Sequence, residues 1–321
     1  MLRYKNIDLI IIVGAQKSGT SSLFKYLSGH HQVIGSIMKQ SCYFMSKNYY
    51  ELNKRDVPKA YSDKLEDFLS LFPSVPHGTK ALVEATPDYL HTPSVLARIK
   101  AMGCYFRSVQ VVAILRHPVD RFISWHRFSM QLNKIPTHTS LQAYFAMNGN
   151  ILEDFKESDG CFFAKESGKY EQFLPLASDF FGANLHVFNF NQLKDDPKEL
   201  LSTLCKHIGL DLNYYDQYKF EVENKTVSVR SPILGKIYII LRRLYIFMMT
   251  TPARKVAKPI RNMISKAYHR INDIKHAPIN DIHQQEFYHD LYKYYENTIR
   301  FCNQHYNFKW KEECIHSRDG D

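Results

Sequence analysis

Residues 7–27, IDLIIIVGAQKSGTSSLFKYL, decide how the fold begins. An apolar run over residues 9–13 ends at Gly14, and a Gly19-Thr20 pair opens an amphipathic pattern. A buried strand, a glycine-containing turn and a helix in this order bring backbone amides and the positive end of the helix dipole toward one point. The stretch therefore predicts a loop that binds an anion, most simply a phosphate.

The position of the lysine separates this loop from the common nucleotide-hydrolase loop. G-x-x-x-x-G-K-[ST] would place lysine at position 20, where this chain has Thr20, and the only lysine inside the loop is Lys17. A metal-dependent enzyme of that type usually ends a second strand in an acid. Here the run VQVVAIL is followed by Arg116. The two positions predict cations facing a doubly anionic ligand, and no metal is expected.

Short apolar runs alternate with helical patterns along the rest of the chain, which has 321 residues and is 45% hydrophobic. This alternation predicts an α/β fold with a P-loop-like central parallel sheet flanked by helices, in a single domain over residues 1–321. The polar stretches 49–79 and 132–160 are predicted to be insertions or loops. Strands are expected in IDLIIIV, KALVE, SVQVVAILR and ANLHVFNF, and helices over 20–28, 94–102, 119–130, 169–181 and 197–208.

The net charge of +10 is concentrated in one segment. Residues 225–275 contain twelve Lys or Arg and one acid, so that segment carries +11 and the rest of the chain sums to −1. Residues 232–272 are predicted to form a basic amphipathic helical appendage. It either lies on an anionic membrane surface, packs on the core with a solvated face, or follows an acidic polysaccharide. Nucleic acid is not an expected partner, because no known binding motif accompanies the charge.

Cysteine usage and the N-terminus bear on location. The six cysteines include no C-x-x-C pair, which favours reduced thiols, although a Cys302–Cys314 link stays open. The first apolar run is far shorter than the roughly 20 residues that a membrane span needs. It also leads directly into the glycine loop, unlike a signal peptide. We therefore expect a cytoplasmic protein, held peripherally at the inner membrane face if the basic segment binds lipid.

Two motifs in the correct order resemble a known family. VGAQKSGTSSLFKYLSGHHQV followed by VVAILRHPVDRFISWHRF is similar to the sulfotransferases that use 3′-phosphoadenosine-5′-phosphosulfate, above all the heparan sulfate N- and 3-O-sulfotransferases and their bacterial relatives. The stretch VEATPDY resembles the family's acid-containing strand, and Gly168 with Tyr170 resembles its later G-x-Y motif. The likeness is strong over residues 8–128, weaker over 168–210 and faint near Trp310.

The resemblance implies roles for particular residues. In the family, the lysine of the first loop assists the leaving phosphate, which here falls on Lys17, and the arginine and serine of the second motif bind the 3′-phosphate, which here are Arg116 and Ser124. Without the family, the second motif is equally compatible with a solvated arginine and a surface serine. The predicted donor-binding set is Gln16, Lys17, Ser18, Gly19, Thr20, Ser21, Arg116, Ser124, Tyr170 and Arg230.

One departure concerns the base. Family members commonly carry K-E-x-x-[FY]-F after the first helix, and the glutamate is taken to accept the proton of the acceptor. This chain reads KQSCYF, and the amide of Gln40 cannot accept a proton at neutral pH. Glu84, at the end of a predicted strand, is the leading replacement, unless it only organises the site by pairing with Lys17 or Lys39. His91 and Asp88 are weaker candidates, and His91 is retained in the predicted catalytic set with Lys17 and Glu84.

The predicted function is transfer of a sulfuryl group from 3′-phosphoadenosine-5′-phosphosulfate to a hydroxyl or amine of a carbohydrate or glycolipid. Two alternatives stay open. A P-loop kinase or other phosphotransferase is disfavoured by Lys17 and Arg116, and a non-catalytic nucleotide-binding protein associated with membranes is kept open by Gln40.

Overall fold

The computed structural model describes residues 4–46, 49, 64–149, 160–221, 240–241 and 282–312. Its centre is a five-stranded sheet in the order β2-β3-β1-β4-β5, and every neighbouring pair of strands is parallel. The first strand along the chain therefore lies in the middle of the sheet. The strands are β1 (Asp8–Gly14), β2 (Val33–Gly35), β3 (Ala81–Ala85), β4 (Val109–Leu115) and β5 (Leu185–Asn189).

The continuous apolar run of β1 is explained by burial on both faces. Alternate residues of a strand point to opposite sides of the sheet. Leu9 and Ile11 lie in one hydrophobic cluster, whereas Ile10 and Ile12 lie in the other. Because both faces are covered, the strand needs an apolar side chain at every position rather than at every second one.

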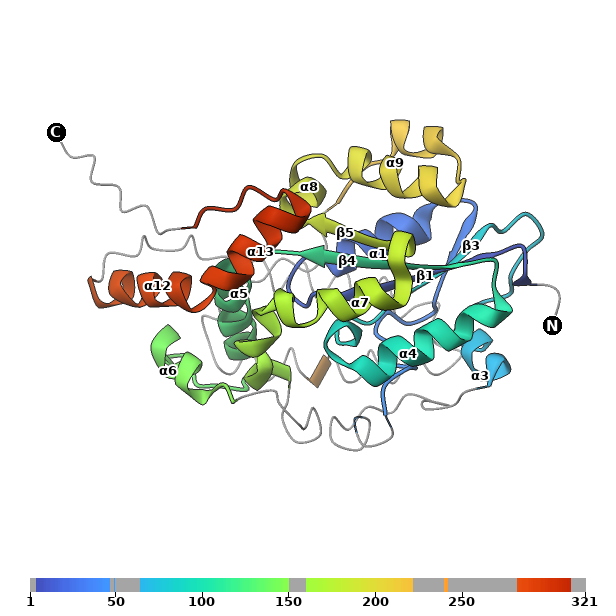
Figure 1. The fold of residues 1–321 in the computed structure, drawn as a ribbon. Helices are drawn as coiled ribbons and strands as arrows, with labels where there is room; N and C mark the ends of the chain where they lie inside the picture. The colour runs from blue at the N-terminus through green and yellow to red at the C-terminus, as the bar shows by residue number, and fades with distance from the viewer. Residues whose placement is uncertain are drawn as a thin grey trace.

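Two layers of helices provide this cover (Figure 1). On one face, α1 (Thr20–Gly29) and α9 (Pro197–Ile208) share a hydrophobic cluster with the sheet, and α8 (Phe190–Asp195) lies beside α9. The other face carries α4 (Pro93–Met102), α7 (Leu174–Phe181) and α5 (Pro118–Gln131), with α13 (Glu296–Tyr306) against the same cluster. Among the described residues, the other α-helices are α3 (Leu65–Leu69), α6 (Leu141–Met147) and α12 (Ile282–Tyr294). Short 3₁₀ turns are η2 (Tyr89–His91), η3 (Gly103–Tyr105), η4 (Gly160–Phe163), η5 (Glu166–Gly168), η6 (Tyr170–Gln172), η7 (Gly182–Asn184) and η8 (Leu212–Gln217).

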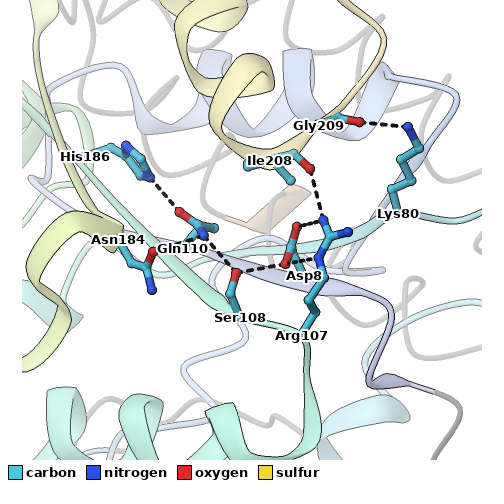
Figure 2. Close-up of polar contacts among 9 residues, drawn as sticks. All are labelled: Asp8, Lys80, Arg107, Ser108, Gln110, Asn184, His186, Ile208 and Gly209. Carbon is cyan, nitrogen blue, oxygen red and sulfur yellow. Dashed lines mark hydrogen bonds and ion pairs between the residues drawn. The ribbon is translucent and has the colours of Figure 1, made fainter.

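The amino end of the sheet is closed by a polar network (Figure 2). Buried Asp8 pairs with Arg107 and accepts a hydrogen bond from Ser108 Oγ at 2.8 Å. Arg107 also donates to the carbonyl oxygen of Ile208 at the end of α9, at 3.0 Å. The network joins the starts of β1 and β4 to α9. Side chains at this end are thus used for structure, and the carboxyl ends of the strands, which point toward α5 and α13 in Figure 1, are left for ligands.

Most predicted elements are confirmed, and the exceptions have physical causes. The strand expected to end near Glu84 ends one residue later, and the helix expected over 169–181 begins only at Leu174, because residues 170–172 form the 3₁₀ turn η6. The stretches predicted as loops contain α3 and α6. The three-residue β2 was not predicted, since it is too short to show a period. No helix in the described ranges is long and apolar enough to cross a membrane.

Candidate active site

The loop between β1 and α1 has the backbone shape of an anion-binding turn. Lys17 and Gly19 have φ angles of 67° and 88°, both in the left-handed region. Gly19 is the N-cap of α1, and within the described residues no side chain caps the helix. A Cβ at Gly19 would lie 2.8 Å from Leu193 Cδ2, so glycine is needed for the close approach as well as for the turn. The amides that open α1 are therefore available to an anion.

Lys17 joins this loop to α5. Its Nζ lies 3.7 Å from the centre of the Phe128 ring, a cation–π contact. Phe128 is four residues after Ser124, so the two side chains lie on one face of α5. Ser124 is buried, with 8% of its surface exposed. The structure thus brings the first motif beside the helical face that carries the serine of the second.

Arg116 leaves the sheet directly after β4. Its side chain is 27% exposed, with Nε 3.9 Å from Asp120 Oδ2, and its guanidinium lies 5.1 Å from the Phe190 ring centre. Burial lowers the pKa of Arg116, and the charge of Asp120 opposes the change. Arg116 is partly desolvated and Ser124 is buried, so neither is the solvated side chain that the sequence alone also allowed. An anion bound to Arg116 would stabilise the charge of the guanidinium and offset the loss of water contacts that burial causes.

The G-x-Y motif fixes the position of Arg116. Buried Tyr170 donates its hydroxyl hydrogen to the carbonyl oxygen of Arg116 at 2.9 Å, and burial raises the pKa of Tyr170 to about 12. Fully buried Arg121 donates from Nη2 to Ser167 Oγ at 2.8 Å and to the carbonyl oxygen of Ala164. Residues 164–170 are thereby attached to both β4 and α5. A tyrosine with this bond supports the predicted 3′-phosphate site by holding its arginine.

Gly168 lets the G-x-Y segment approach α13. A Cβ at Gly168 would lie 2.8 Å from Tyr295 Cε1 and 3.2 Å from Arg121 Nη2. Tyr295 in turn donates to the carbonyl oxygen of Lys165 at 2.8 Å. The glycine is therefore required for packing against a ring and a guanidinium.

Glu84 lies at the carboxyl end of β3 with no exposed surface. Its Oε1 accepts hydrogen bonds from Ser41 Oγ at 2.8 Å and from Thr86 Oγ1 at 2.7 Å. Among the described residues, no partner is found for Oε2. Burial raises the pKa of Glu84 to about 7, against the opposing effects of the two hydroxyls and the charge of Lys39. A carboxyl with this pKa can exchange a proton near neutral pH.

Two further acidic or basic side chains stand near the loop. Asp88, 2% exposed, accepts a hydrogen bond from Gln16 Nε2 and so touches the loop directly. His91 packs its ring edgewise on Phe173, and its Nε2 lies 3.2 Å from the carbonyl oxygen of Ser167. Burial and the charge of Arg121 lower the pKa of His91 to about 3. Its described contacts are those of a neutral ring that braces the 164–170 segment.

The structure describes all of the predicted donor-binding residues except Arg230, and they come from the loop after β1, the start of α1, the end of β4, α5 and the turn η6. Arg230 and the basic segment 232–272 lie outside the described residues, apart from residues 240–241. Sequence reasoning named Lys39 only as a possible partner of Glu84; in the structure its ammonium donates to Ser21 Oγ at 2.9 Å and to Thr20 Oγ1 at 3.3 Å. The one available signal was the match of Lys39 to the family's K-E-x-x-[FY]-F motif.

Comparison with known proteins decides what this site belongs to. Residues 9–214 match the profile of the Sulfotransferase family, a span that contains both predicted phosphate motifs and the G-x-Y motif. The chain belongs to the sulfotransferase family. It is therefore a transferase enzyme, which removes the kinase and the non-catalytic alternatives.

Individual relatives of this sulfotransferase agree with the profile. A membrane-associated sulfotransferase, kil1, of Dictyostelium discoideum is 31% identical over 38% of this chain and 23% of its own length. The bifunctional heparan sulfate N-deacetylase/N-sulfotransferase of Drosophila melanogaster is 23% identical over 72% of this chain and 23% of its own. Mouse heparan sulfate glucosamine 3-O-sulfotransferase 3A1 is 24% identical over 69% of this chain and 50% of its own length. The chain thus spans 23% to 50% of the length of these relatives.

A solved structure supports the fold. The sulfotransferase from Alicyclobacillus acidocaldarius superposes with a TM-score of 0.56 at 20% identity, covering 72% of this chain and 90% of its own. At this level of identity the likeness concerns the arrangement of sheet and helices.

Proposed function

We propose that this sulfotransferase takes its sulfuryl group from 3′-phosphoadenosine-5′-phosphosulfate. The observation that supports the proposal is the contact of Lys17 with Phe128, which brings the loop before the uncapped start of α1 beside the face of α5 that carries Ser124. A ligand with a phosphosulfate at one end and a separate phosphate at the other could use both proposed anion-binding elements, the start of α1 and the residues Arg116 and Ser124. A ligand with a single phosphate would leave one element unused.

The proposed roles follow from these positions. The amides and hydroxyls at the start of α1 hold the 5′-phosphosulfate, and Lys17 stabilises the charge that develops on the leaving 5′-phosphate. Arg116 and Ser124 hold the 3′-phosphate, with Tyr170 fixing the main chain of Arg116. The oxygen or nitrogen of the acceptor attacks sulfur in line, the bond from sulfur to the phosphate oxygen breaks, and adenosine 3′,5′-bisphosphate leaves.

Glu84 is the proposed base for the acceptor's proton. Its carboxyl is held by Ser41 and Thr86, and its raised pKa suits proton transfer near neutral pH. Since Ser41 directly follows Gln40, Glu84 lies within reach of the turn in which relatives carry their acid. His91 is the alternative base.

The acceptor is proposed to be a carbohydrate or glycolipid. Two of the relatives above are named for heparan sulfate, and this supports a sugar hydroxyl or amine as the group that receives the sulfuryl. A de-sulfated heparan oligosaccharide is the first acceptor to test.

Binding of the product tests the donor. A ligand that binds only the folded state stabilises it by about 2.7 kcal/mol at 100 times its Kd. We expect adenosine 3′,5′-bisphosphate to raise the melting temperature without magnesium, and adenosine 5′-phosphate to raise it less. A shift with Mg·ATP and none with the bisphosphate would overturn the proposal.

Attachment to an anionic membrane surface through residues 232–272, on the cytoplasmic side, is a further proposal supported by charge. Each cation near such a surface contributes about 1 kcal/mol. The protein should sediment with vesicles that contain phosphatidylserine and be released by high salt. Absence of sedimentation at low salt would refute it.

A further inference from the structure

The segment after β2 delivers Lys39 to the start of α1. Ser36 N–H donates to the carbonyl oxygen of Val83 at 2.9 Å, and Gln40 N–H donates to that of Ala85 at 2.8 Å. These bonds continue the pairing with β3 beyond the end of β2 and extend the segment to the carboxyl edge of the sheet. These main-chain hydrogen bonds to β3 therefore position Lys39 beside the start of α1.

The turn at Gln40 directs its two neighbours into the site. Gln40 has a φ of 61°, a left-handed conformation that residues other than glycine adopt uncommonly. On one side of it, Lys39 Nζ donates to Ser21 Oγ at 2.9 Å and to Thr20 Oγ1 at 3.3 Å. On the other side, Ser41 Oγ donates to Glu84 Oε1 at 2.8 Å. The segment thus links the anion-binding helix to the proposed base.

The placement of the Lys39 ammonium is electrostatically unusual. The N-terminal end of a helix carries about half a positive charge, which stabilises anions and repels cations. The first turn of α1 contains no acid, and Lys39 is half-buried, so the solvent screens its charge incompletely. An anion bound between the ammonium and the helix amides would turn this repulsion into attraction from both sides.

Lys17 lies in the loop itself, whereas Lys39 reaches the start of α1 from the side of β3. Lys17 contacts Phe128 on α5, which follows β4, whereas Lys39 arrives along the edge of β3. In the sheet, β1 and its loop lie between β3 and β4. A phosphosulfate at the start of α1 would therefore have a lysine on either side.

We propose that Lys39 is a second lysine that contacts the sulfuryl donor and stabilises the leaving 5′-phosphate opposite Lys17, an inference that rests on the proposed function. Its Nζ gives its hydrogen bonds to phosphosulfate oxygens in place of the hydroxyls of Thr20 and Ser21. When the bond from sulfur to the phosphate oxygen breaks, the electron pair stays on that oxygen, and Lys39 with Lys17 stabilises the added charge. Lys39 transfers no proton in this step, since the acceptor's proton goes to Glu84.

The test compares Lys39→Met, Lys39→Arg and a control, Lys25→Met. Lys25 lies on α1, but its side chain is 38% exposed and paired with Glu221. We expect Lys39→Met to slow single-turnover cleavage of labelled donor about 100-fold, the usual effect of removing one group that stabilises developing charge. Lys39→Arg should recover part of the rate, and Lys25→Met should match wild type.

Two measurements separate this role from a structural one. Calorimetry with adenosine 3′,5′-bisphosphate should show about tenfold weaker binding in Lys39→Met. The acid limb of the rate against pH should move to higher pH, because losing a nearby positive charge makes Glu84 harder to ionise. A Lys39→Met variant with donor cleavage within about threefold of wild type would overturn the inference.

Failure of the inference can be told from failure of the proposed function. A wild-type protein that does not bind adenosine 3′,5′-bisphosphate would refute the function, and Lys39 with it. If wild type binds the bisphosphate and Lys39→Met binds it equally well, the function stands and the role of Lys39 is refuted.

Discussion

Replacing Glu84 with glutamine tests the base with little change in shape. Glutamine keeps a carbonyl oxygen that can accept the hydrogen bonds now made by Ser41 and Thr86 at 2.8 and 2.7 Å. It cannot take up a proton. Because general-base assistance is worth about 10²- to 10⁴-fold in rate, we expect kcat to fall within that range and the affinity for adenosine 3′,5′-bisphosphate to stay nearly unchanged.

The change in the free energy of unfolding with pH gives a second, independent test of Glu84. Burial raises the pKa of Glu84 from 4.5 to about 7. Between these values the folded protein holds a proton that the unfolded chain has lost, so the free energy of unfolding falls as pH rises, by about 1.4 kcal/mol per pH unit. The contribution is fully present below pH 4.5 and is lost as pH rises through about 7, a total of about 3 kcal/mol. Glu84→Gln should remove this fall in the free energy of unfolding.

The assay is kcat against pH and urea unfolding against pH, for wild type, Glu84→Gln and the exposed control Glu66→Gln. The wild-type kcat should have an acid limb at or above pH 7, since donor binding raises the proton affinity of Glu84, and Glu84→Gln should lack this limb. If Glu84→Gln keeps full kcat and an unchanged limb, Glu84 is not the base and His91 is next to be tested. A limb caused by His91 would lie far lower, because burial lowers the pKa of that ring to about 3.

Three other predictions concern the donor site and its packing. Lys17→Ala should slow single-turnover transfer more than about threefold while weakening bisphosphate binding less, and equal losses in both would contradict its role with the leaving group. Arg116→Ala and Ser124→Ala should each cost roughly 1.5–3 kcal/mol in binding of adenosine 3′,5′-bisphosphate but little with adenosine 5′-phosphate, as measured by calorimetry. Gly168→Ala should lower the free energy of unfolding by about 1–3 kcal/mol, whereas Gly149→Ala, with nothing within 4 Å of its new Cβ, should not.

The sheet could be predicted because its signal is local. The apolar run of β1 and the turn at Gly14 define a buried strand and its end within seven residues. The sequence predicted a helix from residue 169, but α7 begins at Leu174 because residues 170–172 form a 3₁₀ turn. The hydrogen bond from Tyr170 to Arg116 that holds this turn joins residues 54 positions apart. Elements shaped by such distant contacts have no signature in their own sequence.

The same distinction divides the site. Lys17, Arg116 and Ser124 stand in two motifs whose spacing predicts their positions, and the structure brings them to one edge of the sheet. The position of Lys39 depends on pairing with β3 and on the left-handed turn at Gln40, neither of which is visible in the residue pattern. The complete burial of Arg121 was equally hidden, because arginine is rarely found without exposed surface.

The loss of the acid at Gln40 has a consequence for the order of events. Glu84 is buried, and the nearby charge of Lys39 lowers its pKa against the effect of burial. A phosphosulfate bound beside Lys39 would offset that charge, so the proton affinity of Glu84 should rise when the donor binds. Glu84 then becomes a stronger base in the complex that needs one, and donor binding near pH 7 should be accompanied by partial proton uptake. Because the amide of Gln40 cannot take up a proton, this coupling between the donor and the base falls on Glu84.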